Sequence, residues 1–235
     1  MKQKVAFWPH KNPCSFPLVG SYPVNPGRAF FIAGKRYTGH PFRMDDHSNL
    51  ALTSPHPMPQ TIAFLRAINV GGHTVKMADL RQLFEALGFS NVETFIASGN
   101  VIFDAAGEAG ELERKIEPHL HKALGYEVIT FLRTIPELAA VAEHTPFANW
   151  EAEAENTLFI AFLKDVPTKE AQEKLMALEN EIDHFHVHQR EAYWLRNERY
   201  GKSEFIGKML EKALGPATMR NSTTVRKMAA KYSGQ

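Results

Sequence analysis

The chain has 235 residues, enough for one large or two small domains with a sizeable core. Its composition, 44% hydrophobic, 23% charged and 11% aromatic, is that of a globular protein and excludes disordered and fibrous classes. The formal net charge of +1 does not favour nucleic-acid binding, and the longest apolar run, Leu158–Leu163, is far below the roughly 18 residues of a membrane helix.

Residues 1–57 differ in composition from the rest of the chain. They hold eight of the fourteen prolines, which interrupt helix and sheet hydrogen bonding, and they show no sustained periodicity. With seven basic and two acidic residues they carry +5, so residues 58–235 carry −4. We predict a weakly ordered extension, compatible with translation from upstream of a start at Met58; a basic arm that binds an acidic partner is the alternative. The single cysteine, Cys14, excludes an internal disulfide and a cysteine-based zinc site, so we expect a cytoplasmic protein without a membrane segment.

From Thr61 onward the apolar spacing predicts regular structure. The first half, about 58–150, contains a strand, a glycine loop, a helix, two hairpin strands, a second helix and a fourth strand. In chain order these are Thr61–Ile68, Asn69–Gly72, Met77–Leu87, Val92–Ala97, Val101–Phe103, Leu112–Ala123 and Tyr126–Arg133. This β-α-β-β-α-β order is that of a ferredoxin-like unit. A capping box from Thr134 to Glu137 then opens a bridging helix, Ile135–Glu143.

The second half, about 151–235, repeats the pattern more weakly. Its predicted elements are strand Thr157–Leu163, helix Glu170–Leu178, hairpin strands Asp183–His188 and Ala192–Arg196, and helices Ser203–Leu214 and Thr223–Tyr232. We therefore expect an α+β fold of two duplicated ferredoxin-like subdomains. A doubly wound parallel sheet is less economical because it needs helices between nearly all strands.

The best candidate site lies on one rim of the first half. In the predicted unit, the end of the first strand, the start of the first helix and the hairpin turn lie together, and this brings together Arg66, Asn69, Gly71, Gly72, Lys76, Ser98, Gly99 and Asn100. Glycines before a helix let backbone N–H groups approach an anion, and Arg66 and Lys76 supply positive charge for a phosphate or carboxylate. The structural alternative is a tight turn in which Arg66 pairs with a carboxylate from the other half.

Secondary candidates lie in the second half: Lys202 and Ser203, at the predicted helix start, and Arg220 and Asn221, before the last helix. His184, His186 and His188 alternate on one strand and so share a face. Alternate strand residues are roughly 7 Å apart, so we interpret them as a solvated or interfacial face and predict neither a metal nor another cofactor.

Several motifs resemble the bacterial family catalogued as domain of unknown function (DUF) 1697. They are Arg66–Gly72, Val75–Arg81, Ser98–Phe103, Tyr200–Ser203 and Thr218–Val225, so the resemblance covers about Pro59 to Tyr232. The resemblance implies a duplicated ferredoxin-like α+β fold and no established activity, cofactor or catalytic residue. The family usually has glycine where Ala67 stands, an aromatic residue where Ser222 stands and lysine where Glu204 stands.

Three function hypotheses follow. The first is a binding module for an anionic ligand, a nucleotide or a nucleic-acid phosphate, for which Phe95, Phe103 and Phe131 are available as stacking aromatics. The second is a hydrolase or transferase that uses Lys76, Ser98 or Ser203. The third is a protein-interaction module; the sequence sets no oligomeric state.

Overall fold

The computed structural model describes residues 31–32, 35–36, 58–69, 72, 74–152 and 154–234. The chain divides into two units, Met1–Thr53 and Ser54–Gln235. In the first unit, β1 (Phe31–Ile32) and β2 (Lys35–Arg36) pair antiparallel. The other residues of the predicted extension, Cys14 among them, lie outside the described residues, and the prediction of weak order stays a prediction.

The first half of the second unit forms one four-stranded antiparallel sheet with two helices. Its elements are β3 (Gln60–Leu65), α1 (Met77–Glu85), β4 (Ser90–Thr94), β5 (Asn100–Asp104), α2 (Ala109–Leu124) and β6 (Thr130–Thr134). The strand order is β4-β5-β3-β6. The predicted strand to Ile68 was too long: β3 ends at Leu65, because Ala67 adopts a left-handed φ of 63° that no strand continues through.

The second half forms another four-stranded antiparallel sheet, in the order β10-β7-β9-β8. Its elements are η1 (Trp150–Ala152), β7 (Asn156–Phe162), α4 (Lys169–Met176), β8 (Asp183–His188), β9 (Glu191–Asn197), η2 (Glu198–Tyr200), α5 (Gly207–Leu214), β10 (Thr218–Asn221) and α6 (Ser222–Tyr232). β10 was not predicted from the sequence, and α5 begins at Gly207, later than the predicted start at Ser203. The reason is that the Ser203 hydroxyl holds an extended segment, accepting a hydrogen bond from the Phe205 N–H and donating one to Asp183.

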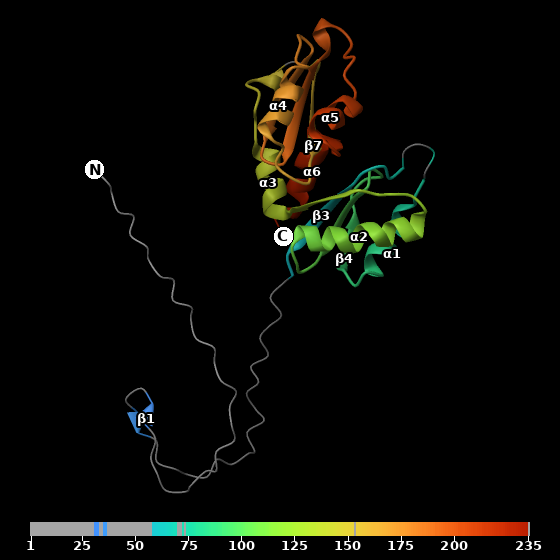
Figure 1. Cartoon of the computed structure of the whole chain (residues 1–235), viewed down its shortest axis with the longest axis vertical. Coiled ribbons are helices and arrows are strands. Elements are labelled where there is room, and N and C mark those ends of the chain that lie inside the picture. The colour runs from blue at the N-terminus through green and yellow to red at the C-terminus, as the bar shows by residue number, and fades with distance from the viewer. Residues whose placement is uncertain are drawn as a thin grey trace, which may run out of the picture. The chain divides into compact units, whose positions relative to one another are not determined.

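The two sheets share a core along their inner faces. The rings of Phe64 on β3 and Phe162 on β7 stack with centroids 3.9 Å apart and an angle of 12°. Such pairs contribute about 0.5–1.5 kcal/mol beyond their buried area. α3 (Ile135–Glu143) and α6 lie side by side at one edge of this core (Figure 1). The capping box at Thr134 and Glu137 is present as predicted, and α3 buries Leu138 and Val141 in the shared core. Both halves therefore pack on one another through apolar side chains.

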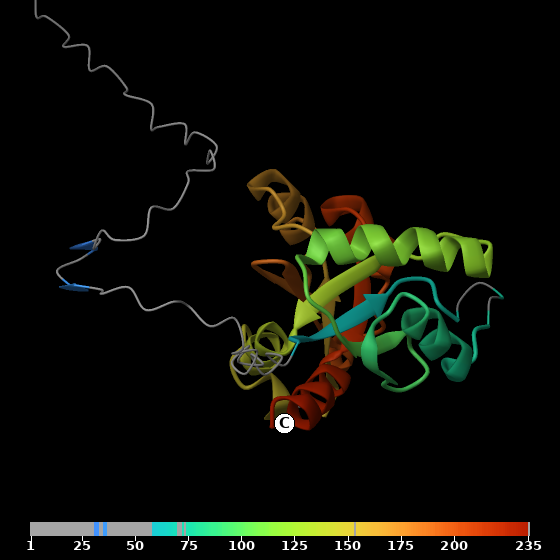
Figure 2. The ribbon, with the colours of Figure 1, turned by 90° about the horizontal axis from the view of Figure 1, so that it is seen from below.

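The other helices cover the outer faces of the sheets. α1 and α2 pack on the first sheet, where α2 crosses the strands (Figure 2), and α4 and α5 pack on the second sheet. Phe103 and Phe131 are fully buried in these cores, and Phe95 packs edge-on against Tyr232. The prediction that Phe103 and Phe131 are available for stacking RNA bases was therefore wrong, while Phe95 is half-buried. No helix in the described part of the chain is long and apolar enough to cross a membrane.

Candidate functional site

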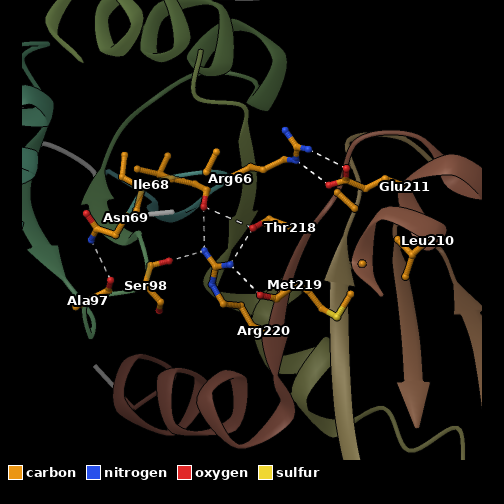
Figure 3. Close-up of a pocket in the computed structure, with 14 residues that line it drawn as sticks. Arg66, Ile68, Asn69, Ala97, Ser98, Leu210, Glu211, Thr218, Met219 and Arg220 are labelled. Carbon is orange, nitrogen blue, oxygen red and sulfur yellow. Dashed lines mark hydrogen bonds and ion pairs between the residues drawn. The ribbon is translucent and has the colours of Figure 1, made fainter. Parts of the chain in front are cut away.

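A cavity of about 420 Å³ opens between the two halves, beyond the end of β3. The first half contributes Arg66 and its neighbours and the β4–β5 turn at Ser98, and the second half contributes α5 and β10 (Figure 3). Its volume falls in the range of small-molecule sites, about 300–1,000 Å³. The predicted rim is therefore half of a cleft, and the second sheet supplies the rest.

Arg66 spans this cleft. Its Nε and Nη2 atoms donate to the two carboxylate oxygens of Glu211 on α5, at 2.7 and 2.8 Å. This hydrogen-bonded pair raises the pKa of Arg66. The structure thus gives Arg66 the partner foreseen by the alternative interpretation, a carboxylate from the other half.

Arg220, on β10, points across into the first half and forms part of the cavity lining (Figure 3). Its guanidinium donates to Asn100 Oδ1 at 2.6 Å and to the Thr218 hydroxyl at 2.8 Å. It also donates to the carbonyl oxygens of Leu65, Ser98, Gly99 and Met219 at 2.8–3.4 Å. All six acceptors are neutral. Burial lowers the pKa of Arg220 to about 10, because removal from water disfavours the charged guanidinium.

Arg133, on β6 of the first half, reaches into the second half, as Arg220 of the second half reaches into the first. Each arginine immediately precedes the N-cap residue of a helix, α3 for Arg133 and α6 for Arg220. Arg133 donates to the carbonyl oxygens of Leu163 and Arg190 at 2.9 and 3.1 Å, and its Nε donates to Glu191 at 2.6 Å. Leu163 directly follows β7 and Leu65 is the last residue of β3, while Glu191 begins β9 as Asn100 begins β5. Asn100 therefore accepts from Arg220 Nε as Glu191 accepts from Arg133 Nε, but it carries no negative charge.

In each half, a basic residue soon after the first strand forms an ion pair with a helix of the other half. Lys164 lies beside Leu163 and binds Glu113 and Glu117 of α2, as Arg66 binds Glu211 of α5. Burial lowers the pKa of Lys164, but the bonds to these two carboxylates outweigh it, so the pKa is raised. A cavity of about 540 Å³ beside Lys164 is lined by two acids, Glu117 and Asp165. The Arg220 cavity instead has two arginines against one glutamate, so the two cavities differ in the sign of their charge.

The remaining rim residues fix the shape of the cleft. Asn69 Nδ2 donates to the Ala97 carbonyl at 3.1 Å, and its Oδ1 accepts from the Val75 N–H at 2.6 Å. The Asn100 amide donates to the Ser98 hydroxyl oxygen at 2.8 Å. At Gly99, φ is 72° and an added Cβ would lie 2.5 Å from Ile68 Cγ2, so only glycine fits there. These contacts hold the loop and the turn in place.

Two rim residues do not join the site. Lys76 is exposed at the N-cap position of α1 without a side-chain cap, and Gly72 is exposed; neither lines the cavity, and their part in a site stays a prediction. Gly71 lies outside the described residues.

The secondary candidate residues do not lie together at one site. Arg220 belongs to the main cleft, which spacing alone could not show because its partners in the first half are more than 100 residues away. The Asn221 side chain accepts from the Thr223 N–H and caps α6. The Ser203 hydroxyl donates to Asp183 at 2.7 Å, and Lys202 lines a different depression.

Comparisons with known proteins concern family and fold. A solved structure, that of the conserved bacterial protein SP0830 from Streptococcus pneumoniae, is similar over 75% of this chain and 99% of its own, with a TM-score of 0.60 and 22% identity. At that identity the likeness shows the fold alone. No curated protein matches the chain. The family described as "Protein of unknown function (DUF1697)" matches residues 58–193, more than half of the chain. The chain therefore belongs to the DUF1697 family.

Proposed function

We propose that the cleft over Arg220 binds a small anionic molecule through its phosphate or carboxylate group. The observation that carries this proposal is a guanidinium that is only 9% exposed and has no carboxylate among its hydrogen-bond partners. A buried charge without a counter-charge is costly, and an anion in the adjoining cavity would offset that cost. The matching arginine, Arg133, has its counter-charge built into the chain as Glu191.

Groups that could contact such an anion line the same cleft. All five N–H bonds of Arg220 are directed at protein acceptors. Arg220 therefore attracts an anion through its positive charge and has no N–H left to donate to it. Among the hydrogen bonds of the described residues, none uses Arg66 Nη1 or the N–H groups of Ala67 and Ile68. These atoms are the donors we assign to the ligand, with the Ser98 hydroxyl hydrogen as a fourth.

The backbone of the loop supports this assignment. Ala67 and Asn69 have φ values of 63° and 56°, in the left-handed region that side chains other than asparagine and aspartate seldom adopt. Strain of this kind costs on the order of 1–3 kcal/mol and is typical of ligand-binding segments.

The walls of the cleft set the class of ligand. Leu65, Ile68, Leu210 and Met219 line it beside the charged groups, so the ligand we infer has a small apolar body as well as an acidic group. A nucleic-acid partner is disfavoured by the burial of Phe103 and Phe131 and by the net charge of −4 on residues 58–235.

We also infer that residues 58–235 are a duplicated domain with ferredoxin-like halves, about 58–150 and 151–235. Both sheets place the first strand between the third and fourth strands, with the second strand outside the third, as a ferredoxin-like unit does. The reciprocal connections of Arg133 and Arg220 support the same duplication.

The experiment is calorimetric titration of the full chain with inorganic phosphate, adenosine monophosphate, acetate and a short RNA. Asn100→Asp places a carboxylate against Arg220 Nε and should weaken binding of the small anions by at least tenfold, since a charge-assisted contact is worth about 1.5–3 kcal/mol. Asn149→Asp, which adds the same charge at an exposed position outside the cavity, should change affinity less than twofold. Equal weakening by both variants, or no binding by the wild-type chain at millimolar anion, would contradict the proposal. Binding of RNA alone would favour the nucleic-acid alternative.

A further inference from the structure

Three histidines from two elements meet at the edge of the second sheet. His144 is the C-cap residue that follows α3, and His186 and His188 lie on β8, which is an outer strand of its sheet. The His144 ring lies 4.3 Å from the His188 ring and 5.4 Å from the His186 ring, centroid to centroid. One nitrogen from each of the three lies within 4.8 Å of the others. His184, on the same face of β8, does not belong to this group.

We propose that His144, His186 and His188 bind a divalent transition-metal cation, with Zn²⁺ as the best match. Neutral imidazole is a preferred ligand of Zn²⁺, and three histidines plus water make a four-coordinate site with one exchangeable position. The site is separate from the anion cleft, and this proposal does not depend on the function proposed above.

The geometry of the cluster is close to what a bound ion needs. Zn–N bonds of about 2.0–2.1 Å in a tetrahedral site put ligand nitrogens about 3.4 Å apart, so the widest nitrogen pair must close by about 1.4 Å. The His144 and His188 rings are nearly parallel, at 13°, and one of them must tilt to direct its lone pair at a common ion. His188 is exposed and has room to make that movement, while the backbone of β8 stays paired with β9.

An unsatisfied nitrogen supports the assignment. His144 Nε2 is buried and has no hydrogen-bond partner among the described residues. A buried polar atom without a partner destabilises the fold, and a metal–nitrogen bond would satisfy it. The ring is fixed from behind by Tyr193, whose ring centroid is 5.0 Å away and whose hydroxyl donates to the Val141 carbonyl of α3.

The local charges allow a cation. The arginines beside His188 are each paired with a carboxylate, Arg133 with Glu191 and Arg190 with Glu137. Their charges therefore cancel locally and do not repel an ion from the cluster.

The test is titration of the untagged full chain, stripped of metal, with zinc chloride in a calorimeter and with cobalt chloride in an absorption spectrometer. We expect one zinc ion per chain with a micromolar or tighter Kd, and the visible bands of four-coordinate cobalt. His188→Ala should weaken zinc binding by at least about tenfold and abolish the cobalt bands, since loss of a ligand should exceed the 10- to 100-fold cost of losing an outer hydrogen bond. Because His188 is exposed, this variant should keep the wild-type melting temperature in the presence of a chelator.

His184→Ala is the matched control, because it removes an imidazole from the same face of the same strand without touching the cluster. It should bind zinc as the wild type does. The other histidines and Cys14 remain in both variants, so an ion held by those groups would bind His188→Ala unchanged. Three results would each overturn the proposal: unchanged zinc binding by His188→Ala, equal losses of affinity in the two variants, or no stoichiometric zinc binding by the wild type.

Discussion

Replacing Glu191 by glutamine tests whether a buried arginine in this fold depends on a carboxylate. Arg133 and Glu191 are 2% and 5% exposed and joined at 2.6 Å, so water cannot replace the lost charge. Glutamine keeps the shape and one acceptor oxygen for Nε, but it leaves the guanidinium with neutral acceptors only, as Arg220 is in the native chain. Breaking a buried pair outright costs about 3–5 kcal/mol, and losing the charge from a hydrogen bond that remains costs about 1.5–3 kcal/mol.

We therefore expect Glu191→Gln to lower the free energy of unfolding by about 2–3 kcal/mol, measured by urea denaturation at pH 7 with an unchanged slope. In a domain of this size the melting temperature should fall by roughly 4–12 °C. Glu198→Gln is the control, because it removes a carboxylate from an exposed pair with Arg196, which should cost at most about 1 kcal/mol. Asn100→Asp should be nearly neutral, since the new ion pair with Arg220 compensates the amide donors that it loses. If Glu191→Gln costs no more than Glu198→Gln, a buried guanidinium needs no carboxylate here, and the inference drawn from Arg220 fails.

Three other expectations follow from the geometry. Ala67→Gly should raise the free energy of unfolding by about 0.5–1 kcal/mol, because φ is 63° there and glycine adopts this conformation without strain; chemical denaturation measures it, and a loss of stability would contradict the strained loop. Gly99→Ala should lower that free energy by at least about 2 kcal/mol through the clash with Ile68, and a neutral effect on the melting temperature would show that the turn can move away. The pKa values of His144 and His186 are lowered in the fold, so the unfolded chain takes up protons first, and stability should fall as the pH drops from about 7 to 5. His144→Gln should flatten this decline in a pH series of melting curves; an equally steep decline would assign it to other groups.

The parts of the fold that sequence predicted best are those with local signals. The capping box fixed the start of α3 at Ile135, and the helix ends at Glu143 as expected. β10 was missed because it is four residues long and carries a buried arginine that resembles a surface residue in sequence. Helical spacing before α5 did not reveal that Ser203 bonds to Asp183, 20 residues away.

The site was predicted in part for the same reason. Arg66, Asn69 and Ser98 lie near one another because the order of elements brings a strand end and a hairpin turn together. Arg220 and Glu211 come from the other half, and no local pattern indicates which residue faces the rim. Spacing along β8 does not reveal that His144 lies beside His186 and His188, because that third imidazole comes from the residue after α3.

The most direct test of the anion cleft is to observe the guanidinium itself. The chain labelled with ¹⁵N gives an Nε–H signal for each buried arginine, and titration with inorganic phosphate should shift that of Arg220 together with the amide signals of Ala67 and Ile68. The Arg133 signal, whose donors face Glu191 and carbonyl oxygens, should stay in place and serve as the internal control. The predicted result is a saturable shift of the Arg220 Nε–H signal with no shift of the Arg133 signal. Phosphate shifts confined to exposed lysines, with Arg220 unmoved, would contradict the account.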